Sequence, residues 1–183
     1  MDDIVKQAMA KWPNVPDCYG WLGLDARGDW YMRDDRVQAL GAFASGVTGA
    51  KGSRLVHDKL IAFIQRNYQA DAQGRWFFQN GPQRVYVELE VAPWIWRVQE
   101  DLSVQSHTGL YTPCTRALVD ERGWLFLETH LGLGLVHTQD MGLAAKALEL
   151  GVWVQSDVLR ADLPTRYGYI VSPAQSSQPL HKS

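Results

Sequence analysis

The sequence predicts an α+β protein built from two similar subdomains, each a set of antiparallel β-hairpins packed by a helix. Three nearly identical phrases, residues 25–31, 71–77 and 120–126, place an aspartate three positions before a glycine and then add aromatic residues. Their first residues lie 46 and 49 positions apart. Aspartate at the start of a tight turn bonds its own backbone, and glycine adopts a positive φ without steric cost. Aromatic residues favour the strand that leaves such a turn.

A helix and a hairpin are the first elements in order. Apolar residues recur at helical spacing over residues 2–12, and two prolines follow, so residues 1–17 are predicted as an N-terminal helical segment. Residues 19–24 alternate into the first phrase, and residues 30–32 continue beyond it as a return strand. The first phrase is therefore predicted to be the turn of a hairpin.

A long helix and a second hairpin complete the first subdomain, predicted as residues 18–98. Ser53 is the predicted N-cap of an amphipathic helix whose apolar stripe runs over residues 55–64. After the second phrase, residues 84–91 alternate strictly between apolar and polar side chains, which is typical of a half-buried antiparallel strand. Residues 94–96 resume this pattern after Pro93, as an edge strand or a bend into a neighbouring sheet.

The second subdomain is predicted over residues 99–171, after a polar, turn-rich stretch at 99–113. Its expected elements are a hairpin around the third phrase at 116–129, a strand at 132–136, a helix at 140–150 ended by Gly151 and a strand at 152–154. Residues 172–183 are rich in serine, glutamine and proline and are predicted to be a disordered tail.

Composition narrows the classes of function. The 183 residues are 46% apolar and 21% charged, with a formal net charge of −2, which gives no field to recruit nucleic acid or an anionic membrane. The start is acidic and no apolar stretch is long enough to span a bilayer, so we expect a cytoplasmic protein. Cys18 and Cys114 lack the spacing of a zinc or redox motif and are expected to be free thiols. Eight tryptophans are spread along the chain, and we expect most of them to lie in the core.

The order of motifs over residues 18–98 resembles a bacterial family of domains of unknown function, or a smaller sister family of it. That family repeats a Gly-x-Trp hairpin, here at residues 28–30 and 74–76, then a helix and a Val-Glu-Asp-Ala-Pro-Phe strand, here residues 89–94. Val91 stands where the family usually has aspartate. The resemblance implies a two-part α+β fold with a repeated motif and a place in signalling or ligand sensing. It implies no catalytic residues.

Catalytic and metal-binding patterns are weak in this sequence. The five histidines do not show the spacing of metal ligands, and neither cysteine has a neighbouring histidine. We therefore predict no catalytic residue, no metal and no cofactor. Glu88 and Glu90 share one face of the predicted strand, which favours a solvated sheet face over a polar groove for acid–base chemistry.

The sequence predicts a protein that binds a small molecule or another protein and has a regulatory or sensing role. The hairpin loop and the strands beside it offer amides, a guanidinium, a carboxylate and an indole. The candidate contact residues are Gln79, Asn80, Arg84, Glu88 and Trp94. Trp94 and Trp96 form either an aromatic wall or, as strand aromatics usually do, part of the core. Two alternatives stay open: a hydrolase that uses Glu88, Glu90 or His130, and a structural module that forms a homodimer.

Overall fold

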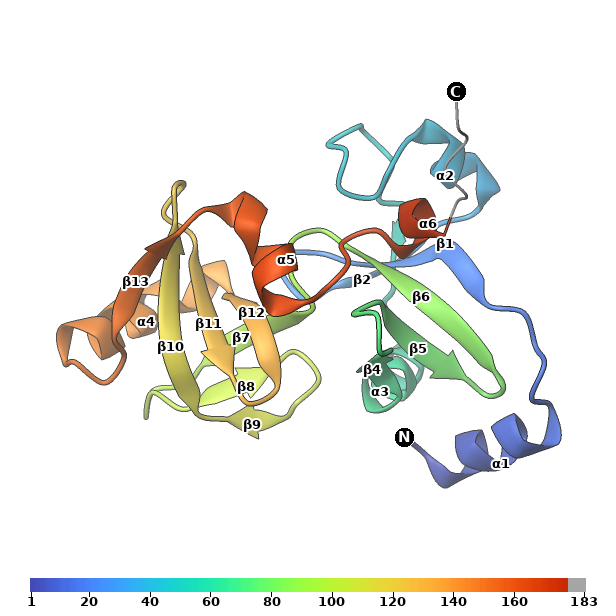
Figure 1. Ribbon diagram of the computed structural model, residues 1–183, viewed down its shortest axis with the longest axis horizontal. Coiled ribbons are helices and arrows are strands. Elements are labelled where there is room, and N and C mark those ends of the chain that lie inside the picture. Colours follow the sequence, from blue (N-terminus) through green and yellow to red (C-terminus); the bar gives the residue numbers. More distant parts are fainter. Residues whose placement is uncertain (178–183) are drawn as a thin grey trace. The chain divides into compact units, whose positions relative to one another are not determined.

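The computed structural model describes residues 1–177, which divide into two compact units. The first unit comprises Met1–Asp25, Asp29–Glu90 and residues 169–177, and the second comprises Ala26–Gly28 and Val91–Gly168. Each unit contains one β-sheet with helices beside it (Figure 1). The predicted α+β class with two similar sheet subdomains is confirmed.

A six-stranded sheet in the order β3-β2-β1-β6-β5-β4 forms the first unit. The strands are β1 (Cys18–Leu24), β2 (Trp30–Met32), β3 (Ser53–Arg54), β4 (Tyr68–Ala70), β5 (Trp76–Asn80) and β6 (Gln83–Leu89). Strands β1 and β6 run parallel, with Leu22 opposite Val87, and the other neighbours are antiparallel. The sheet is therefore mixed and not antiparallel throughout, because the two predicted hairpins join side by side through β1 and β6.

Four helices belong to the first unit: α1 (Asp3–Lys11), α2 (Asp35–Leu40), α3 (Asp58–Arg66) and α6 (Pro173–Ser176). Helix α3 packs on the sheet through Phe63, whose ring meets Phe78 edge-on at 5.4 Å. This helix begins later than predicted. His57 caps it by accepting a hydrogen bond from the Leu60 backbone N–H, because Ser53 is already paired in β3 with Met32 of β2.

The three repeated phrases form the same turn. In each, the aspartate carboxylate accepts a hydrogen bond from the backbone N–H four residues later, at 2.8–3.0 Å for Asp25, Asp71 and Asp120. The glycine three positions after each aspartate has a φ of +83°, +78° and +77° in turn. An added Cβ is strained at such angles, so glycine is needed there.

A seven-stranded mixed sheet in the order β13-β10-β11-β12-β7-β8-β9 forms the second unit. Its strands are β7 (Trp94–Val98), β8 (Val104–Ser106), β9 (Tyr111–Thr112), β10 (Cys114–Asp120), β11 (Leu125–Thr129), β12 (Gly132–Val136) and β13 (Gln155–Val158). Two 3₁₀ turns, η1 (Thr138–Asp140) and η2 (Arg160–Asp162), precede the helices α4 (Met141–Glu149) and α5 (Leu163–Tyr167).

Strand β7 lies in the second sheet, whereas the sequence places residues 94–98 in the first subdomain. It pairs in parallel with β12, with Trp94 opposite Gly134 and Trp96 opposite Val136. A Cβ at position 134 would lie 2.4 Å from the Trp96 indole nitrogen and 2.6 Å from the Trp94 carbonyl oxygen. Glycine at 134 is what lets the two strands approach with both indoles in place.

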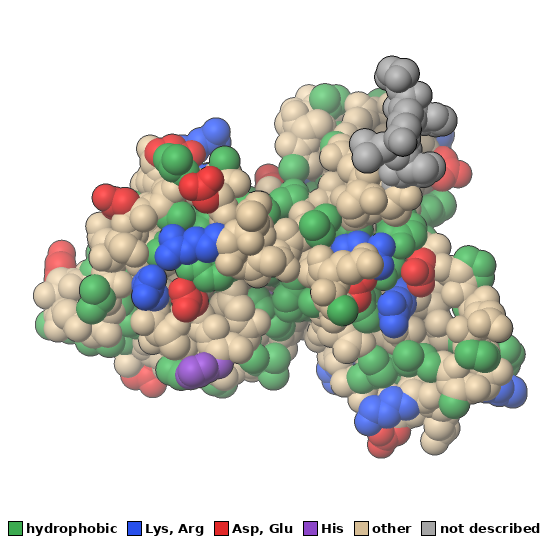
Figure 2. Space-filling model, viewed as in Figure 1, with side chains coloured by type: hydrophobic (Ala, Val, Ile, Leu, Met, Phe, Trp, Pro, Cys, Tyr) green, Lys and Arg blue, Asp and Glu red, His purple; other side chains and the backbone are tan. Residues whose placement is uncertain are grey.

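The C-terminal segment also differs from the predicted disordered tail. Residues 173–176 form α6, and the Val171 carbonyl accepts a hydrogen bond from the Leu89 N–H at 2.8 Å. Residues 178–183 of that predicted tail lie outside the described residues. Within residues 1–177, none of the helices is both long and apolar enough for a membrane crossing. Figure 2 shows acidic and basic side chains interspersed on the viewed face.

Candidate functional site

One face of the β4–β5–β6 hairpins gathers polar side chains in the first unit. Gln79 of β5 lies opposite Arg84 of β6, and Phe77 lies opposite Tyr86. Because side chains alternate along a strand, these four residues project from the same face. Gln69 of β4 joins them as the partner of Phe77.

A polar pocket of about 410 Å³ lies on this face. Gln79 and Arg84 line it together with Asp71 and Arg75 from the second repeated turn, and Met9 of α1 contributes an apolar side chain. The other lining groups are Gln69, Ala70, Ala72, Gln73 and Phe77. A pocket of this volume is in the range that holds a small molecule.

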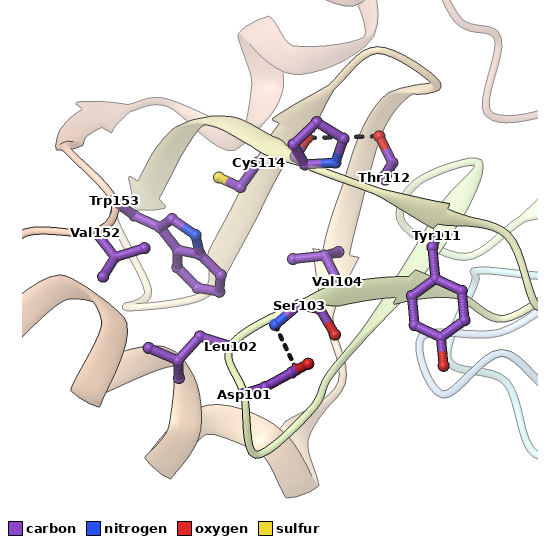
Figure 3. A pocket seen from close by; sticks show the side chains of 10 residues that line it. Asp101, Leu102, Ser103, Val104, Tyr111, Thr112, Cys114, Val152 and Trp153 are labelled. Carbon is purple, nitrogen blue, oxygen red and sulfur yellow. Dashed lines mark hydrogen bonds between the residues drawn. The ribbon is translucent and has the colours of Figure 1, made fainter.

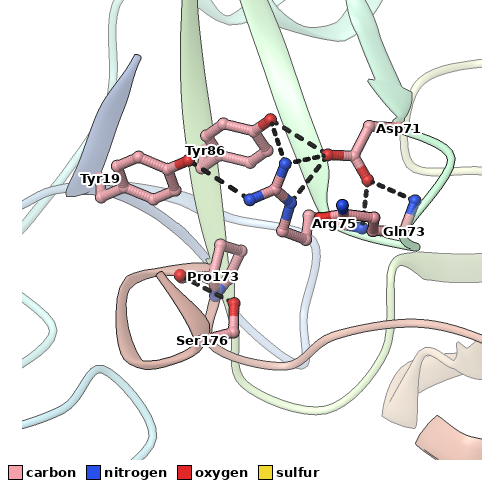
Figure 4. A network of polar contacts seen from close by, with 7 residues as sticks. All are labelled: Tyr19, Asp71, Gln73, Arg75, Tyr86, Pro173 and Ser176. Carbon is pink, nitrogen blue, oxygen red and sulfur yellow. Dashed lines mark hydrogen bonds and ion pairs between the residues drawn. The ribbon is translucent and has the colours of Figure 1, made fainter. Parts of the chain in front are cut away.

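Asp71 and Arg75 form the most connected group of the pocket (Figure 4). The Asp71 carboxylate accepts from the Arg75 Nε at 2.8 Å and from the Tyr86 hydroxyl at 3.1 Å, and its other oxygen accepts from the backbone N–H groups of Gln73 and Arg75. Arg75 also donates to the hydroxyl of Tyr19 at 3.4 Å and to that of Tyr86 at 3.1 Å. Burial acts to raise the pKa of Asp71, but these hydrogen bonds outweigh burial and hold the pKa below its usual value. Asp71 is therefore an ionised carboxylate, and both of its oxygens accept hydrogen bonds within the protein.

Arg84 and Gln79 form fewer hydrogen bonds and ion pairs than Asp71 and Arg75 do. The Arg84 guanidinium lies 4.9 Å from the Phe77 ring centre and close enough to the Tyr86 hydroxyl to lower the pKa of that tyrosine, against the larger opposite effect of burial. Within residues 1–177, Arg84 forms no ion pair. Gln79 is 1% exposed; its side-chain Nε2 donates to the Gly81 carbonyl at 2.9 Å, and its Oε1 has no partner among the described residues.

Glu88, two residues beyond Tyr86, is buried under the C-terminal segment. Its carboxylate accepts from the Ser172 hydroxyl at 2.5 Å and from the Ala174 N–H at 3.0 Å. Burial is the main cause that raises the pKa of Glu88, against hydrogen bonds that lower it. The expectation that this strand face is solvated was wrong, because Tyr86 is fully buried and Glu88 is 3% exposed.

The remaining predicted contact residues lie in other settings. Asn80 is exposed at the end of β5, where it pairs with Gln83. Trp94 belongs to the second unit and is 5% exposed; its indole N–H donates to the Leu131 carbonyl at 2.8 Å, and its ring stacks on Trp96 at 5.8 Å. The pocket therefore brings together Gln79 and Arg84 of the five candidates.

The three groups that a hydrolase would use as acid or base, Glu88, Glu90 and His130, lie in different environments. Glu88 is bonded to Ser172 and Ala174, and Glu90 pairs with Lys51 at 2.8 Å. His130 is exposed in the turn between β11 and β12. Both carboxylates thus hold other segments of the first unit in place.

Sequence reasoning missed Asp71, Gln73 and Arg75 as pocket residues. A signal was present, since Asp71 and Arg75 are four residues apart across a turn that returns the chain on itself. The Asp-Gly pattern by itself predicts only a turn there.

Comparison with known proteins gives a family and two solved structures. The profile of a family described as "Protein of unknown function (DUF2946)", and named DUF2944, matches residues 1–174. A DUF1285 family protein from Silicibacter pomeroyi DSS-3 is similar at a TM-score of 0.47 and 12% identity, over 80% of this chain and 84% of that chain. A DUF1285 family protein from Shewanella baltica OS155 is similar at a TM-score of 0.41 and 14% identity, over 69% of this chain and 91% of that one. None of the curated proteins matches this chain.

Proposed function

This chain belongs to the DUF2944 family of proteins of unknown function, and we propose that it is a non-catalytic binding module with a regulatory or sensing role in the cytoplasm. Its ligand is a small polar molecule with one anionic group and at least one N–H or O–H donor. The ligand occupies the 410 Å³ pocket on the β4–β5–β6 face of the first unit.

The unpartnered Oε1 of Gln79 is the observation that carries this proposal. A buried acceptor without a hydrogen bond costs about 1–3 kcal/mol, so native proteins seldom keep one without a use. Gln79 is 1% exposed and lines the pocket, and its amide is held in place by the bond from Nε2 to the Gly81 carbonyl. A ligand N–H or O–H group in the pocket satisfies the free acceptor.

The charge of the pocket supports an anionic ligand. Arg75 and Arg84 carry the positive charges of the lining, and Asp71 carries the one negative charge. Asp71 is bonded to Arg75, and Arg84 is the arginine of this lining that forms no ion pair within residues 1–177. A guanidinium that has no carboxylate partner can bind a carboxylate or phosphate by two parallel hydrogen bonds.

The lining supports binding more than catalysis. Its titratable side chains are Asp71, Arg75 and Arg84, and Asp71 is kept ionised by its hydrogen bonds. General acid–base chemistry needs a group that exchanges protons near the working pH, and nucleophilic chemistry needs a hydroxyl or thiol beside a base. The amides of Gln69, Gln73 and Gln79 instead supply hydrogen bonds that orient a ligand.

Calorimetric titration with matched probes tests the proposal. Glycerate offers a carboxylate and hydroxyl donors, glycerol lacks the carboxylate, and propionate lacks the hydroxyls. We expect glycerate to bind more tightly than either by about 10-fold or more, since a charge-assisted hydrogen bond contributes about 1.5–3 kcal/mol.

Two arginine variants locate the binding. Arg84→Ala removes the pocket guanidinium that has no carboxylate partner, whereas Arg36→Ala removes an arginine of the same unit whose side chain is 93% exposed. Glycerate affinity should fall about 10-fold or more in Arg84→Ala and stay unchanged in Arg36→Ala. Equal binding by the two variants, with both folds intact, contradicts the assignment.

A further inference from the structure

The second unit contains an apolar pocket of about 560 Å³ where the two ends of its sheet meet (Figure 3). Strand β9 is the last strand on one side of the sheet, and the chain then passes through Pro113 directly into β10 near the other side. Residues from β8 and β9, from the turn before β8 and from the segment before β13 surround the opening. A concave, mostly apolar pocket with a few polar groups is the usual form of a small-molecule site.

Apolar side chains form most of the wall. Leu102 and Val104 lie on one side, and Val152 and Trp153 come from the segment that follows α4 (Figure 3). Trp153 is 6% exposed, so its indole is packed in place before any ligand arrives. The thiol of Cys114 also lines the pocket, and burial raises its pKa to about 11, which makes it a neutral group there.

Leu102 carries unusual backbone strain. Its φ is +65°, and within residues 1–177 it is the one residue other than glycine with a positive φ. The turn enforces this conformation, because the Leu102 N–H donates to the Gln99 carbonyl and the Gln99 N–H donates to the Ser103 carbonyl. Glycine would fit this position without strain, yet the chain keeps a leucine whose side chain forms the pocket wall.

Charge and aromaticity specify the ligand class. Asp101 is the charged residue among the lining groups, and it forms no ion pair within residues 1–177. Its carboxylate accepts a hydrogen bond from the Ser103 N–H at 3.0 Å, which fixes it at the pocket mouth. The indole of Trp153 is the aromatic group of the apolar wall, whereas Tyr111, 65% exposed, projects from the sheet face opposite to that of Val104. A carboxylate in the lining favours a cation and disfavours an anion, and the face of an indole ring also attracts a cation.

We propose that this pocket is a second ligand site, which binds an organic amine in its protonated form. The apolar body of the amine packs between Leu102, Val104 and Trp153, and the ammonium group lies near Asp101. This site differs in chemistry from the polar pocket of the first unit, and neither proposal depends on the other.

Phenethylammonium is the probe for the test, with 2-phenylethanol as its neutral counterpart and 3-phenylpropionate as its anionic one. We expect affinity in calorimetry to fall in the order cation, neutral, anion. Because the Asp101 carboxylate is exposed, the gain of the cation over the alcohol should be about 2- to 5-fold, and Asp101→Asn should abolish that gain.

Cys114 reports where the probe binds. In a Cys18→Ser protein, Cys114 is the remaining thiol, and its place in the pocket lining makes its alkylation by N-ethylmaleimide a probe of that site. Saturating phenethylammonium should slow its alkylation in proportion to occupancy. An unchanged alkylation rate at a concentration where calorimetry shows saturation overturns the location.

Leucine variants test the role of the strained residue. Leu102→Gly removes the side chain and the backbone strain, so the protein should be at least as stable as Leu102→Ala, and both variants should bind the probe several-fold more weakly. Leu110→Ala is the control, since Leu110 is 50% exposed and lies outside the pocket lining. Equal affinity of the Leu102 and Leu110 variants overturns the proposal, as does the absence of probe binding at about 10 mM.

Discussion

The ion pair in the second repeated turn is predicted to be a major stabilising contact of the first unit. Asp71 uses one oxygen for the turn, accepting from the N–H groups of Gln73 and Arg75, and the other for the Arg75 guanidinium and the Tyr86 hydroxyl. Asp71→Asn keeps an acceptor for the turn but removes the charge. Asp71→Ala removes both. The pair of variants therefore separates the turn from the ion pair.

The expected loss of stability follows from the burial of the Asp71–Arg75 ion pair. The side chains of Asp71 and Arg75 are 10% and 21% exposed, so water replaces little of the lost contact. Loss of hydrogen bonds to a charged partner costs about 1.5–3 kcal/mol, and removing one member of a fully buried pair costs up to about 3–5 kcal/mol. We expect Asp71→Asn to lower the free energy of unfolding by about 2–3 kcal/mol. Asp71→Ala should lose about 1 kcal/mol more for each of the two backbone bonds.

Urea and thermal unfolding followed by circular dichroism measure this loss. For a chain of this length, Asp71→Asn should lower Tm by about 4–12 °C. Asp34→Asn is the control, since Asp34 also accepts a backbone N–H, from Val37, and its ion-pair partner Arg36 is 93% exposed. A Tm for Asp71→Asn equal to that of Asp34→Asn would refute the reasoning.

Two further predictions concern a close approach and a buried carboxyl. Gly134→Ala should lower the free energy of unfolding by several kcal/mol, because the new Cβ would lie 2.4 Å from the Trp96 indole nitrogen. Gly142→Ala in α4 is the control and should be neutral or slightly stabilising, because a Cβ there has nothing within 4 Å. Urea unfolding compares the two variants. The pKa of Glu88 is raised in the folded protein, so stability should fall as pH rises from the pKa of the unfolded chain, 4.5, through the pKa of the folded protein. Glu88→Gln should flatten the slope of Tm against pH. Parallel slopes for the variant and the unchanged protein would contradict this prediction.

Local features were predictable from the sequence. The three turns follow from one aspartate and one glycine three positions apart, and their geometry depends on no distant residue. The same locality placed Gln79 and Arg84 together, because the hairpin between them makes them cross-strand partners.

Features that depend on distant partners were not predictable. The alternation of residues 84–91 does not show which segment covers the polar face of the strand. In the structure Glu88 on that face is bonded to Ser172, which lies 84 positions away in the sequence. Strand β7 pairs in parallel with β12, where Gly134 leaves room for two tryptophans some 40 positions earlier, and residues 94–98 therefore belong to the second sheet. Pattern alone could not assign these contacts, since it reports periodicity and not the partner.

Side-chain NMR during a glycerate titration tests the central claim most directly. The account predicts that the Gln79 side-chain amide and the Arg84 Nε–H resonances shift with one saturable curve, while the exposed Arg36 Nε–H does not move. Unshifted Gln79 and Arg84 resonances at saturation, or shifts of equal size at Arg36, would contradict a ligand site in this pocket.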